Sequence, residues 1–336
     1  MRWAWTRTEW SGRRAAAPAG VVADALDPGR VSIMEQSDTV TFIGLGHAGW
    51  HMAANVFAGG FRLIVGDIDS ERERRFVTEH VGALRLSDVG ASEAGVVVTS
   101  LPNGHVVREA ILDSGLAASL APGSIVVDMS SSAPAGTLAL ADELAELGLI
   151  LVDAPVSMPT PDGAWTRRLT VMVGGNDEAA LDRIHPILES MSENIFRVGP
   201  LGAGHAVKTL NNFVSSAGYV AALDALAVGA RYGVDPERMF EVFNVSTARN
   251  FATAYPLRQE ALTRRFATGF QLGLFVKDLG ITNDLMDELE LDSSLARVLH
   301  RLMDAARAEL GYEADCSEAI KFWEKKSGVT IPTSAI

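Results

Sequence analysis

One lysine, in the stretch GAGHAVKTLNN at residues 202–212, has neighbours suited to proton transfer. Lys208 and Asn212 are four residues apart, so they would share one face of a helix. A lone helix lysine is usually solvated, but this one begins a long pattern rich in alanine, valine and leucine. A low dielectric there would lower the pKa of the Lys208 amine toward the working range. The pattern makes Lys208 a candidate general base, with Asn212 orienting a substrate hydroxyl or carboxylate, and a solvated helix lysine is the alternative.

A second constellation consists of three glycines after an apolar run. The letters GLGHAG place Gly44, Gly46 and Gly49 in the G-x-G-x-x-G spacing, before a helical pattern at 47–58. Such a backbone can approach a pyrophosphate whose charge faces the helix N-terminus. A tight strand-to-helix turn would give the same letters. Asp67, which ends the next apolar run, favours the dinucleotide, because a carboxylate there accepts hydrogen bonds from the ribose hydroxyls.

The same segment bears on the choice between NAD and NADP. Ile68 stands where an arginine would favour a 2′-phosphate, and the carboxylate of Asp67 would repel that phosphate. This pattern predicts a preference for NAD. Three nearby arginines keep NADP open as the alternative: Arg72, Arg74 and Arg75.

Two kinds of domain are expected to position these residues. Runs rich in valine, isoleucine and leucine alternate with helical stretches up to residue 200, which indicates a parallel sheet covered on both faces. The expected strands after the first are 62–67, 95–102, 124–130, 149–156, 169–175 and 194–199. The expected helices after residue 200 are 204–232, 236–244, 253–264, 271–290, 292–310 and 315–326. We therefore predict a disordered leader at 1–37, an α/β Rossmann-type domain at 38–200 and an all-α domain at 201–330, joined by a long inter-domain helix.

Composition excludes several functional classes. The 336 residues can bury two cores, and a formal net charge of −13 argues against nucleic acid or an anionic membrane surface as a partner. No uninterrupted apolar run reaches the roughly 18 residues of a membrane helix. The single cysteine, Cys316, excludes an internal disulfide and suits a reducing compartment such as the cytoplasm. His47 and His51 could share a helix face, but no third ligand is near, so no metal site is expected.

Seven motifs together resemble the β-hydroxyacid dehydrogenases, a family that includes 3-hydroxyisobutyrate dehydrogenase and is related to 6-phosphogluconate dehydrogenase. They run in order over about residues 39–326: FIGLGHAGWHMAANVFAGGF, SLPN, VVDMSSSAP, DAPVS, LTVMVGG, GAGHAVKTLNN and FVKDLGI. The resemblance implies a Rossmann-type domain, a long inter-domain helix, and a helical domain that usually dimerises. A homodimer or homotetramer is therefore expected.

The resemblance also implies roles for individual residues. Lys208 matches the catalytic lysine and Asn212 its partner. The implied cofactor-binding residues are Gly44, Leu45, Gly46, His47, Ala48, Gly49, Asp67, Ile68, Leu101, Pro102, Ser131 and Lys277. The implied substrate-binding residues are Ser131, Ser157, Lys208, Asn212 and Asp278.

The substrate loop departs from the family pattern. In SMPTPDGAWTRRLT, Met158 and Pro159 replace two glycines, so one N–H donor is lost and bulk is added. The carboxylate site is therefore expected to be rebuilt, with Met158 as a substrate contact. Arg167 stands where the family has a later glycine. It could pair with an acidic substrate, although a solvated strand edge is an equal alternative.

Taken together, these patterns predict an NAD(P)-dependent dehydrogenase that oxidises a small acidic 3-hydroxy acid, with Lys208 as general acid and base. A reductase of a small aldehyde or 2-keto acid is the first alternative. A non-catalytic nucleotide-binding scaffold is the second, and the lysine and asparagine argue against it.

Overall fold

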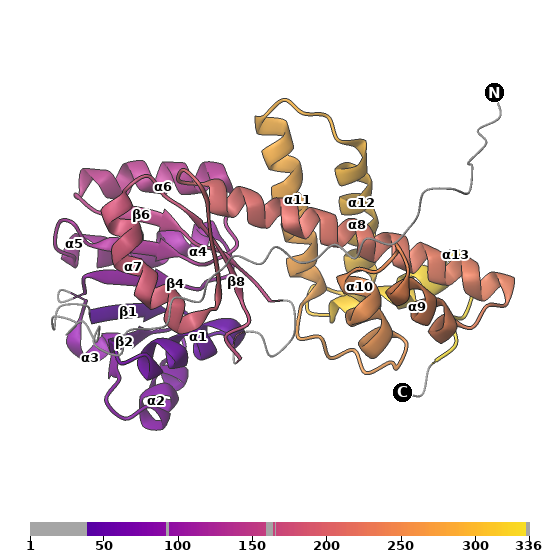
Figure 1. The fold of residues 1–336 in the computed structure, drawn as a ribbon, viewed down its shortest axis with the longest axis horizontal. Coiled ribbons are helices and arrows are strands. Elements are labelled where there is room, and N and C mark those ends of the chain that lie inside the picture. Colours follow the sequence, from indigo (N-terminus) through magenta and orange to yellow (C-terminus); the bar gives the residue numbers. More distant parts are fainter. Residues whose placement is uncertain (1–38, 92–93, 159–163, 165, 334–336) are drawn as a thin grey trace, which may run out of the picture. The chain divides into compact units, whose positions relative to one another are not determined.

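The computed structural model describes residues 39–91, 94–158, 164 and 166–333, so the expected leader at 1–37 lies outside the described residues. Within the described residues, a sheet flanked by helices comes first and a mostly helical part follows (Figure 1). This is the Rossmann-type and all-α fold class that the sequence predicts. We propose the domain boundary near residue 200, in the turn between the last strand and the long helix.

The sheet is built from the valine- and isoleucine-rich runs. Its strands are β1 (Thr39–Ile43), β2 (Arg62–Gly66), β3 (Leu84–Arg85), β4 (Val96–Thr99), β5 (Ile125–Asp128), β6 (Ile150–Asp153), β7 (Val156–Ser157), β8 (Thr170–Gly174) and β9 (Asn194–Gly199). Their order is β3-β2-β1-β4-β5-β6-β8-β7, with β9 paired to β8. The strands from β3 through β6 are parallel, whereas β8 is antiparallel to β6 and β7. The sequence did not predict β3 or β7, because two residues carry no periodic pattern.

The chain order reverses beside β1. From β1 the chain moves outward to β2 and β3, and then crosses to β4, β5 and β6 on the other side. The loops that leave β1 and β4 therefore diverge, and the carboxyl ends of these two strands border a crevice of the kind that binds nucleotides. Gly44 follows β1 and Ser100 follows β4, so both lie at this edge.

Helices cover both faces of the sheet, because successive strand side chains point to opposite sides. Val40 and Phe42 join one core with α1 (His47–Ala58) and α7 (Glu178–Met191), and Ile43 joins the other core with α6 (Pro134–Glu146). The shorter elements here are α2 (Ser70–Glu79), α3 (Leu86–Val89), α4 (Gly104–Arg108), α5 (Leu116–Ser119) and a π-helical turn at Glu109–Asp113.

The long helix α8 (Ala203–Tyr232) runs from the sheet into the helical part (Figure 1), where it contributes Leu223 and Leu226 to a third core. The other elements there are α9 (Pro236–Val245), α10 (Phe251–Ala254), α11 (Leu272–Glu288), α12 (Ser294–Leu310), α13 (Ala319–Ser327), a π-helical turn at Pro256–Ala261 and a 3₁₀ turn at Cys316–Glu318. The single helix predicted at 253–264 is wrong. Pro256 has no N–H for the helical ladder, so α10 ends at Ala254 and a separate π turn follows.

Among the described residues, α8 is also the one helix long and apolar enough, by length and composition, to cross a membrane. It packs against β8 at one end and against α9, α10, α11 and α13 further along. These contacts account for its apolar composition as that of a core helix.

Candidate active site

The glycine loop between β1 and α1 has the geometry of a phosphate site. Gly44 has φ +97°, and a Cβ there would lie 2.3 Å from the carbonyl oxygen of Ser100. A Cβ at Gly49 would lie 2.0 Å from the carbonyl oxygen of Gly44, so only glycine allows α1 to approach the loop. At Gly46, by contrast, a Cβ would meet no described atom within 4 Å.

The N-terminus of α1 lies next to this glycine loop and is suited to an anion. Gly46 is the N-cap residue of α1, and no side chain caps the helix. Gly46 therefore has no side chain that would compete for the first N–H groups of α1, and the helix dipole would stabilise a pyrophosphate bound to them. These residues fit a dinucleotide.

Neighbouring residues of the loop have different environments. Leu45 is buried and donates its N–H to the Asp67 carboxylate at 2.7 Å. His47 is exposed, and Ala48 is partly buried against the core.

The carboxylate of Asp67 is held at the end of β2 by three neighbours. It accepts the N–H of Leu45, the N–H of Asp69 at 2.9 Å, and Arg72 Nη1 at 3.2 and 3.3 Å. These bonds occupy the carboxylate's roughly four acceptor positions. Ile68 next to it is fully exposed, which leaves an apolar side chain beside the nucleotide crevice.

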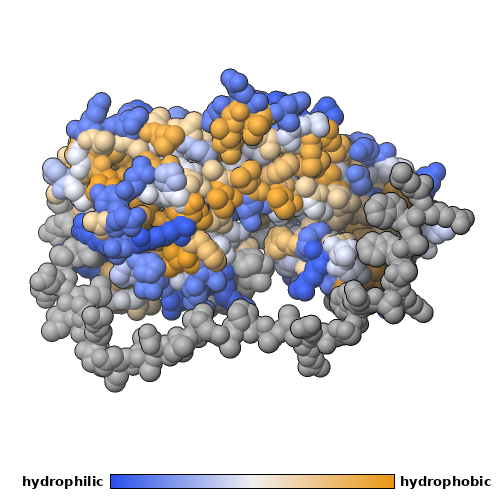
Figure 2. All heavy atoms as spheres, turned by 45° about the horizontal axis from the view of Figure 1, so that its top comes forward, coloured by the Kyte–Doolittle hydropathy of each residue, from blue (hydrophilic) through white to orange (hydrophobic). Residues whose placement is uncertain are grey.

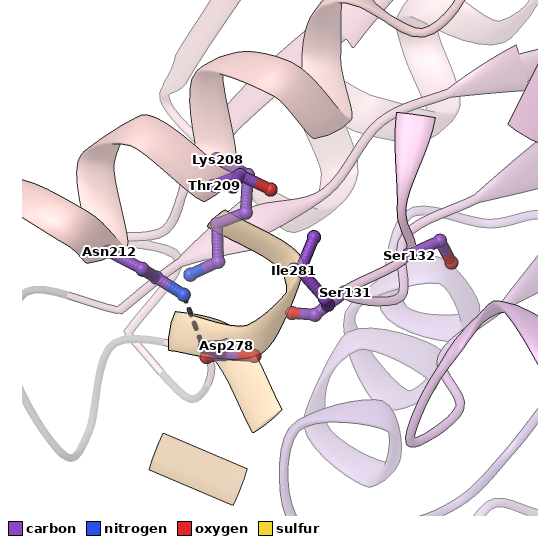
Figure 3. Close-up of a pocket in the computed structure, with 7 residues that line it drawn as sticks. All are labelled: Ser131, Ser132, Lys208, Thr209, Asn212, Asp278 and Ile281. Atoms are coloured by element: carbon purple, nitrogen blue, oxygen red, sulfur yellow. Dashed lines mark hydrogen bonds between the residues drawn. The ribbon is translucent and has the colours of Figure 1, made fainter. Parts of the chain in front are cut away.

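A small pocket lies where α8 and α11 meet the loop after β5 (Figure 3). Its lining residues are Ser131, Ser132, Lys208, Thr209, Asn212, Asp278 and Ile281. The Lys208 amine extends toward Asn212 and Asp278, and the Ser131 hydroxyl points into the same space (Figure 3). Asn212 Nδ2 donates to Asp278 Oδ2 at 2.8 Å. The structure thus brings together the four residues of α8, α11 and the β5 loop that the sequence nominated for substrate binding.

The environment of Lys208 shifts the equilibrium of its amine toward the neutral form. Burial lowers the pKa of Lys208 below its ordinary value, because the charged form is poorly solvated there. The negative charge of Asp278 opposes this effect, and the positive charge of Lys277 adds to it. An amine with a lowered pKa can take up a proton at moderate pH, as a general base must.

Lys277 connects the helical part to the carboxyl edge of the sheet. Its Nζ donates to the carbonyl oxygens of Pro102 at 3.0 Å and Ser131 at 3.3 Å, and pairs with Asp278 Oδ1 at 3.0 Å. The first two acceptors follow β4 and β5, beside Leu101, whose N–H donates to Ser130 Oγ. The cofactor-binding residues proposed for this edge therefore lie together.

Three nominated residues of the substrate loop are not brought to this pocket. Ser157 is paired with Thr170 in the β7–β8 ladder, and Met158 packs against the core of the sheet domain. Arg167 is exposed, and its guanidinium donates to the carbonyl oxygen of Glu189 near the end of α7. Pro159, the replaced glycine position, lies outside the described residues.

Sequence reasoning missed three residues that line the pocket, Ser132, Thr209 and Ile281. Ile281 lies three residues after Asp278, so the helical spacing of the FVKDLGI motif could have identified it. In the described part of the chain, no group of three or more His, Cys, Asp or Glu residues is placed to hold a metal ion.

Comparison with known proteins agrees with this geometry. Residues 39–199 match the model of the NAD binding domain of 6-phosphogluconate dehydrogenase. Residues 202–323 match the model described as NAD-binding of NADP-dependent 3-hydroxyisobutyrate dehydrogenase.

Individual relatives match over most of the chain. It is 34% identical to 2-(hydroxymethyl)glutarate dehydrogenase of Eubacterium barkeri over 89% of this chain and 99% of that protein. It is 33% identical to the NAD-dependent L-serine dehydrogenase of Pseudomonas aeruginosa over 86% of this chain and 99% of that protein. A solved structure of Mycobacterium tuberculosis 3-hydroxyisobutyrate dehydrogenase with L-serine has a TM-score of 0.76 and 28% identity, and covers 85% of this chain and 98% of that one.

Proposed function

The chain belongs to the β-hydroxyacid dehydrogenase family and is an NAD(P)-dependent oxidoreductase of hydroxy acids, and from this premise we propose that it oxidises a small acidic 3-hydroxy acid with Lys208 as general acid and base. The observation that carries the proposal is the Lys208 amine, whose pKa is lowered by burial, in a pocket at the carboxyl edge of the sheet.

The proposed reaction divides the two hydrogens of the alcohol between protein and cofactor. A neutral Lys208 amine accepts the hydroxyl proton, and in the reverse direction the ammonium returns it to the carbonyl oxygen. Bound NAD⁺ supplies the acceptor for the hydride from the carbinol carbon. Asn212, oriented by its bond to Asp278, and Ser131 hold the substrate hydroxyl and carboxylate in the pocket.

The substrate class rests on the relatives and on the pocket. The relatives named above are dehydrogenases of 2-(hydroxymethyl)glutarate, L-serine and 3-hydroxyisobutyrate, all small hydroxy acids. Arg167 bonds to Glu189 in this structure, and we expect it to contribute little to the carboxylate site. A substrate carboxylate would instead meet the hydroxyl of Ser131 and the amide of Asn212.

A panel of hydroxy acids tests the proposed activity. With NAD⁺ and the three acids above, the absorbance of reduced nicotinamide should rise with at least one of them. The matched reverse panel uses small aldehydes and 2-keto acids with NADH, and a strong preference for that panel would favour the reductase alternative. No signal with any member of either panel would revive the scaffold alternative.

Arg72 is expected to influence the choice of cofactor. Because it occupies acceptor positions of Asp67, ribose hydroxyls can bind this carboxylate only when Arg72 moves aside, and the freed guanidinium is the cation that a 2′-phosphate needs. We expect wild type to prefer NAD⁺. Arg72→Ala should lower kcat/KM for NADP⁺ by about tenfold, the loss of one charged hydrogen bond, without lowering it for NAD⁺.

Arg75→Ala is the matched control for Arg72→Ala, measured by initial rates with both cofactors. Arg75 pairs with Glu79 and stacks over Trp50, away from Asp67, so its removal should leave the NADP⁺ to NAD⁺ ratio unchanged. Equal ratios in wild type and Arg72→Ala would exclude Arg72 from cofactor selection.

We propose a homodimer or homotetramer that covers the exposed face of α8. Its exposed apolar side chains recur at helical spacing: Val207, Leu210, Val214, Val228 and Tyr232. Figure 2 shows apolar surface across the middle of the molecule, in the direction that α8 follows in Figure 1. Such a surface is unusual for a monomer.

Charge placed on this face should dissociate the oligomer. Val214→Asp combined with Val228→Asp should give a monomer by light scattering, since two carboxylates would be buried at the contact. Val245→Asp is the control, because Val245 is also an exposed valine but lies at the end of α9. A wild-type monomer would contradict the proposal.

We further propose that the enzyme works in the cytoplasm, consistent with its single buried thiol at Cys316.

A further inference from the structure

A fully buried histidine lies three residues before Lys208, on the first turn of α8. His205 has no exposed surface, and both of its ring nitrogens have partners. Nδ1 is 2.7 Å from Thr137 Oγ1, and Nε2 is 3.2 Å from the carbonyl oxygen of Ser130. Thr137 belongs to α6 and Ser130 to the loop after β5, so one ring joins three separate segments.

The partners define where the protons lie. A carbonyl oxygen only accepts, so His205 Nε2 must carry a hydrogen and donate it to Ser130. With the hydrogen on Nε2, Nδ1 of the neutral ring accepts, so the Thr137 hydroxyl donates to Nδ1 at 2.7 Å rather than to the more distant carbonyl oxygen of Ala133 at 3.2 Å. In this tautomer the Nε2–H of His205 is directed at Ser130.

One buried carboxylate organises the loop that His205 holds. Asp128, at the end of β5, accepts the N–H of Ser130 at 2.9 Å, the hydroxyl of Ser132 at 2.8 Å and the hydroxyl of Thr99 at 2.9 Å. His205 Nε2 is 3.6 Å from Asp128 Oδ2. The loop from Ser130 to Ser132, which includes the pocket residue Ser131, is therefore held on both sides.

A second buried carboxylate fixes the start of α8. Asp153, at the end of β6, accepts the N–H groups of Gly202 and His205, both at 2.8 Å. The N-cap residue Gly202 has no side chain to do this, so a strand-end carboxylate caps the helix from outside. Asp153 Oδ2 also lies 3.7 Å from His205 Nδ1.

We propose that His205 is a positioning residue for catalysis, which sets the spacing between Lys208 on α8 and Ser131 on the β5 loop. The inference rests on the proposed role of Lys208 as the base. Lys208 and Ser131 come from α8 and the β5 loop, and the bond from His205 Nε2 to Ser130 joins these two elements. The bond from Nδ1 to Thr137 on α6 fixes the ring that makes this link. A displacement of about 1 Å at a reacting group can lower turnover 100-fold.

The test compares His205→Leu with His205→Gln in kcat, KM and NAD⁺ affinity. Leucine fills the volume but donates nothing, so kcat should fall about 10- to 100-fold, whereas NAD⁺ affinity should change much less, because the glycine loop and Asp67 are untouched. The amide nitrogen of glutamine reaches the place of Nε2 and can donate to Ser130, so His205→Gln should restore most of kcat. Wild-type kcat and KM in a folded His205→Leu enzyme would overturn the proposal, as would no recovery with glutamine.

A second pair of variants decides the matter if His205→Leu does not fold. Thr137→Val removes the hydroxyl that holds Nδ1, and Thr41→Val makes the same change on β1, where the buried hydroxyl has no hydrogen-bond partner among the described residues. Only Thr137→Val should lower kcat, and equal kcat in both would overturn the proposal. Full activity in Lys208→Ala would instead remove the base itself, which separates failure of the proposed function from failure of this inference.

Discussion

Lys208→Ala should lower kcat for oxidation of the hydroxy acid by about 100- to 10,000-fold, the usual contribution of a general base. The amine lies among Ser131, Asn212 and Asp278, and burial lowers the pKa of Lys208 below its ordinary value. NAD⁺ affinity should be retained, because the glycine loop and Asp67 do not contact this residue. Initial rates and a fluorescence titration with NADH measure the two quantities.

Replacing a lysine elsewhere in the chain with alanine should not lower kcat in this way. Lys325→Ala removes an exposed lysine from α13, where it pairs with Glu309, and should leave kcat unchanged. If Lys208→Ala kept wild-type turnover, the proposed base would be wrong.

The pH dependence of wild type provides a separate check on the same residue. Oxidation needs the neutral amine, so kcat should rise with pH through the pKa of Lys208, which burial lowers and Asp278 raises again. Reduction needs the protonated amine, so its kcat should fall over the same range. The rise of kcat with pH should be absent from the residual oxidation activity of Lys208→Ala. An identical pH profile in that variant would assign the rise to another titrating group.

Two glycine substitutions should separate cofactor binding from folding. Gly46→Ala places a methyl group in open space, so the free energy of unfolding should change by less than about 0.5 kcal/mol. The methyl group would occupy space that the pyrophosphate needs, and NAD⁺ affinity should fall at least about tenfold.

Gly49→Ala should give a different result. Its methyl group would lie 2.0 Å from a backbone oxygen, so α1 or the loop must shift, at a cost of about 1–3 kcal/mol in unfolding free energy. Urea denaturation and NAD⁺ titration of both variants make the comparison. Wild-type NAD⁺ affinity in Gly46→Ala would exclude this loop as the phosphate site.

The element types could be predicted from sequence to a large extent, because they depend on local periodicity. The valine-rich runs became strands, which are parallel from β3 through β6, although β8 runs antiparallel to β6 and departs from the predicted parallel sheet. The 204–232 pattern became α8 with a one-residue difference at its start. The prediction failed where a single residue overrode the pattern, as Pro256 did when it ended α10. It also failed for β3 and β7, which exist only because a neighbouring strand offers them hydrogen bonds.

By itself, the sequence determined the features that depend on neighbours along the chain. The spacing of Lys208 and Asn212 places both on one helix face, and the three glycines mark a loop at a strand end, since helical and strand periods are set by backbone geometry. The tertiary structure alone decided which distant groups meet. Asp278 on α11 accepts a hydrogen bond from Asn212 on α8, and the Asp67 carboxylate accepts one from Arg72. The guanidinium of Arg167 donates to a carbonyl oxygen near the end of α7. Such contacts depend on how separate elements pack against one another, and the spacing of residues along the chain does not determine that packing.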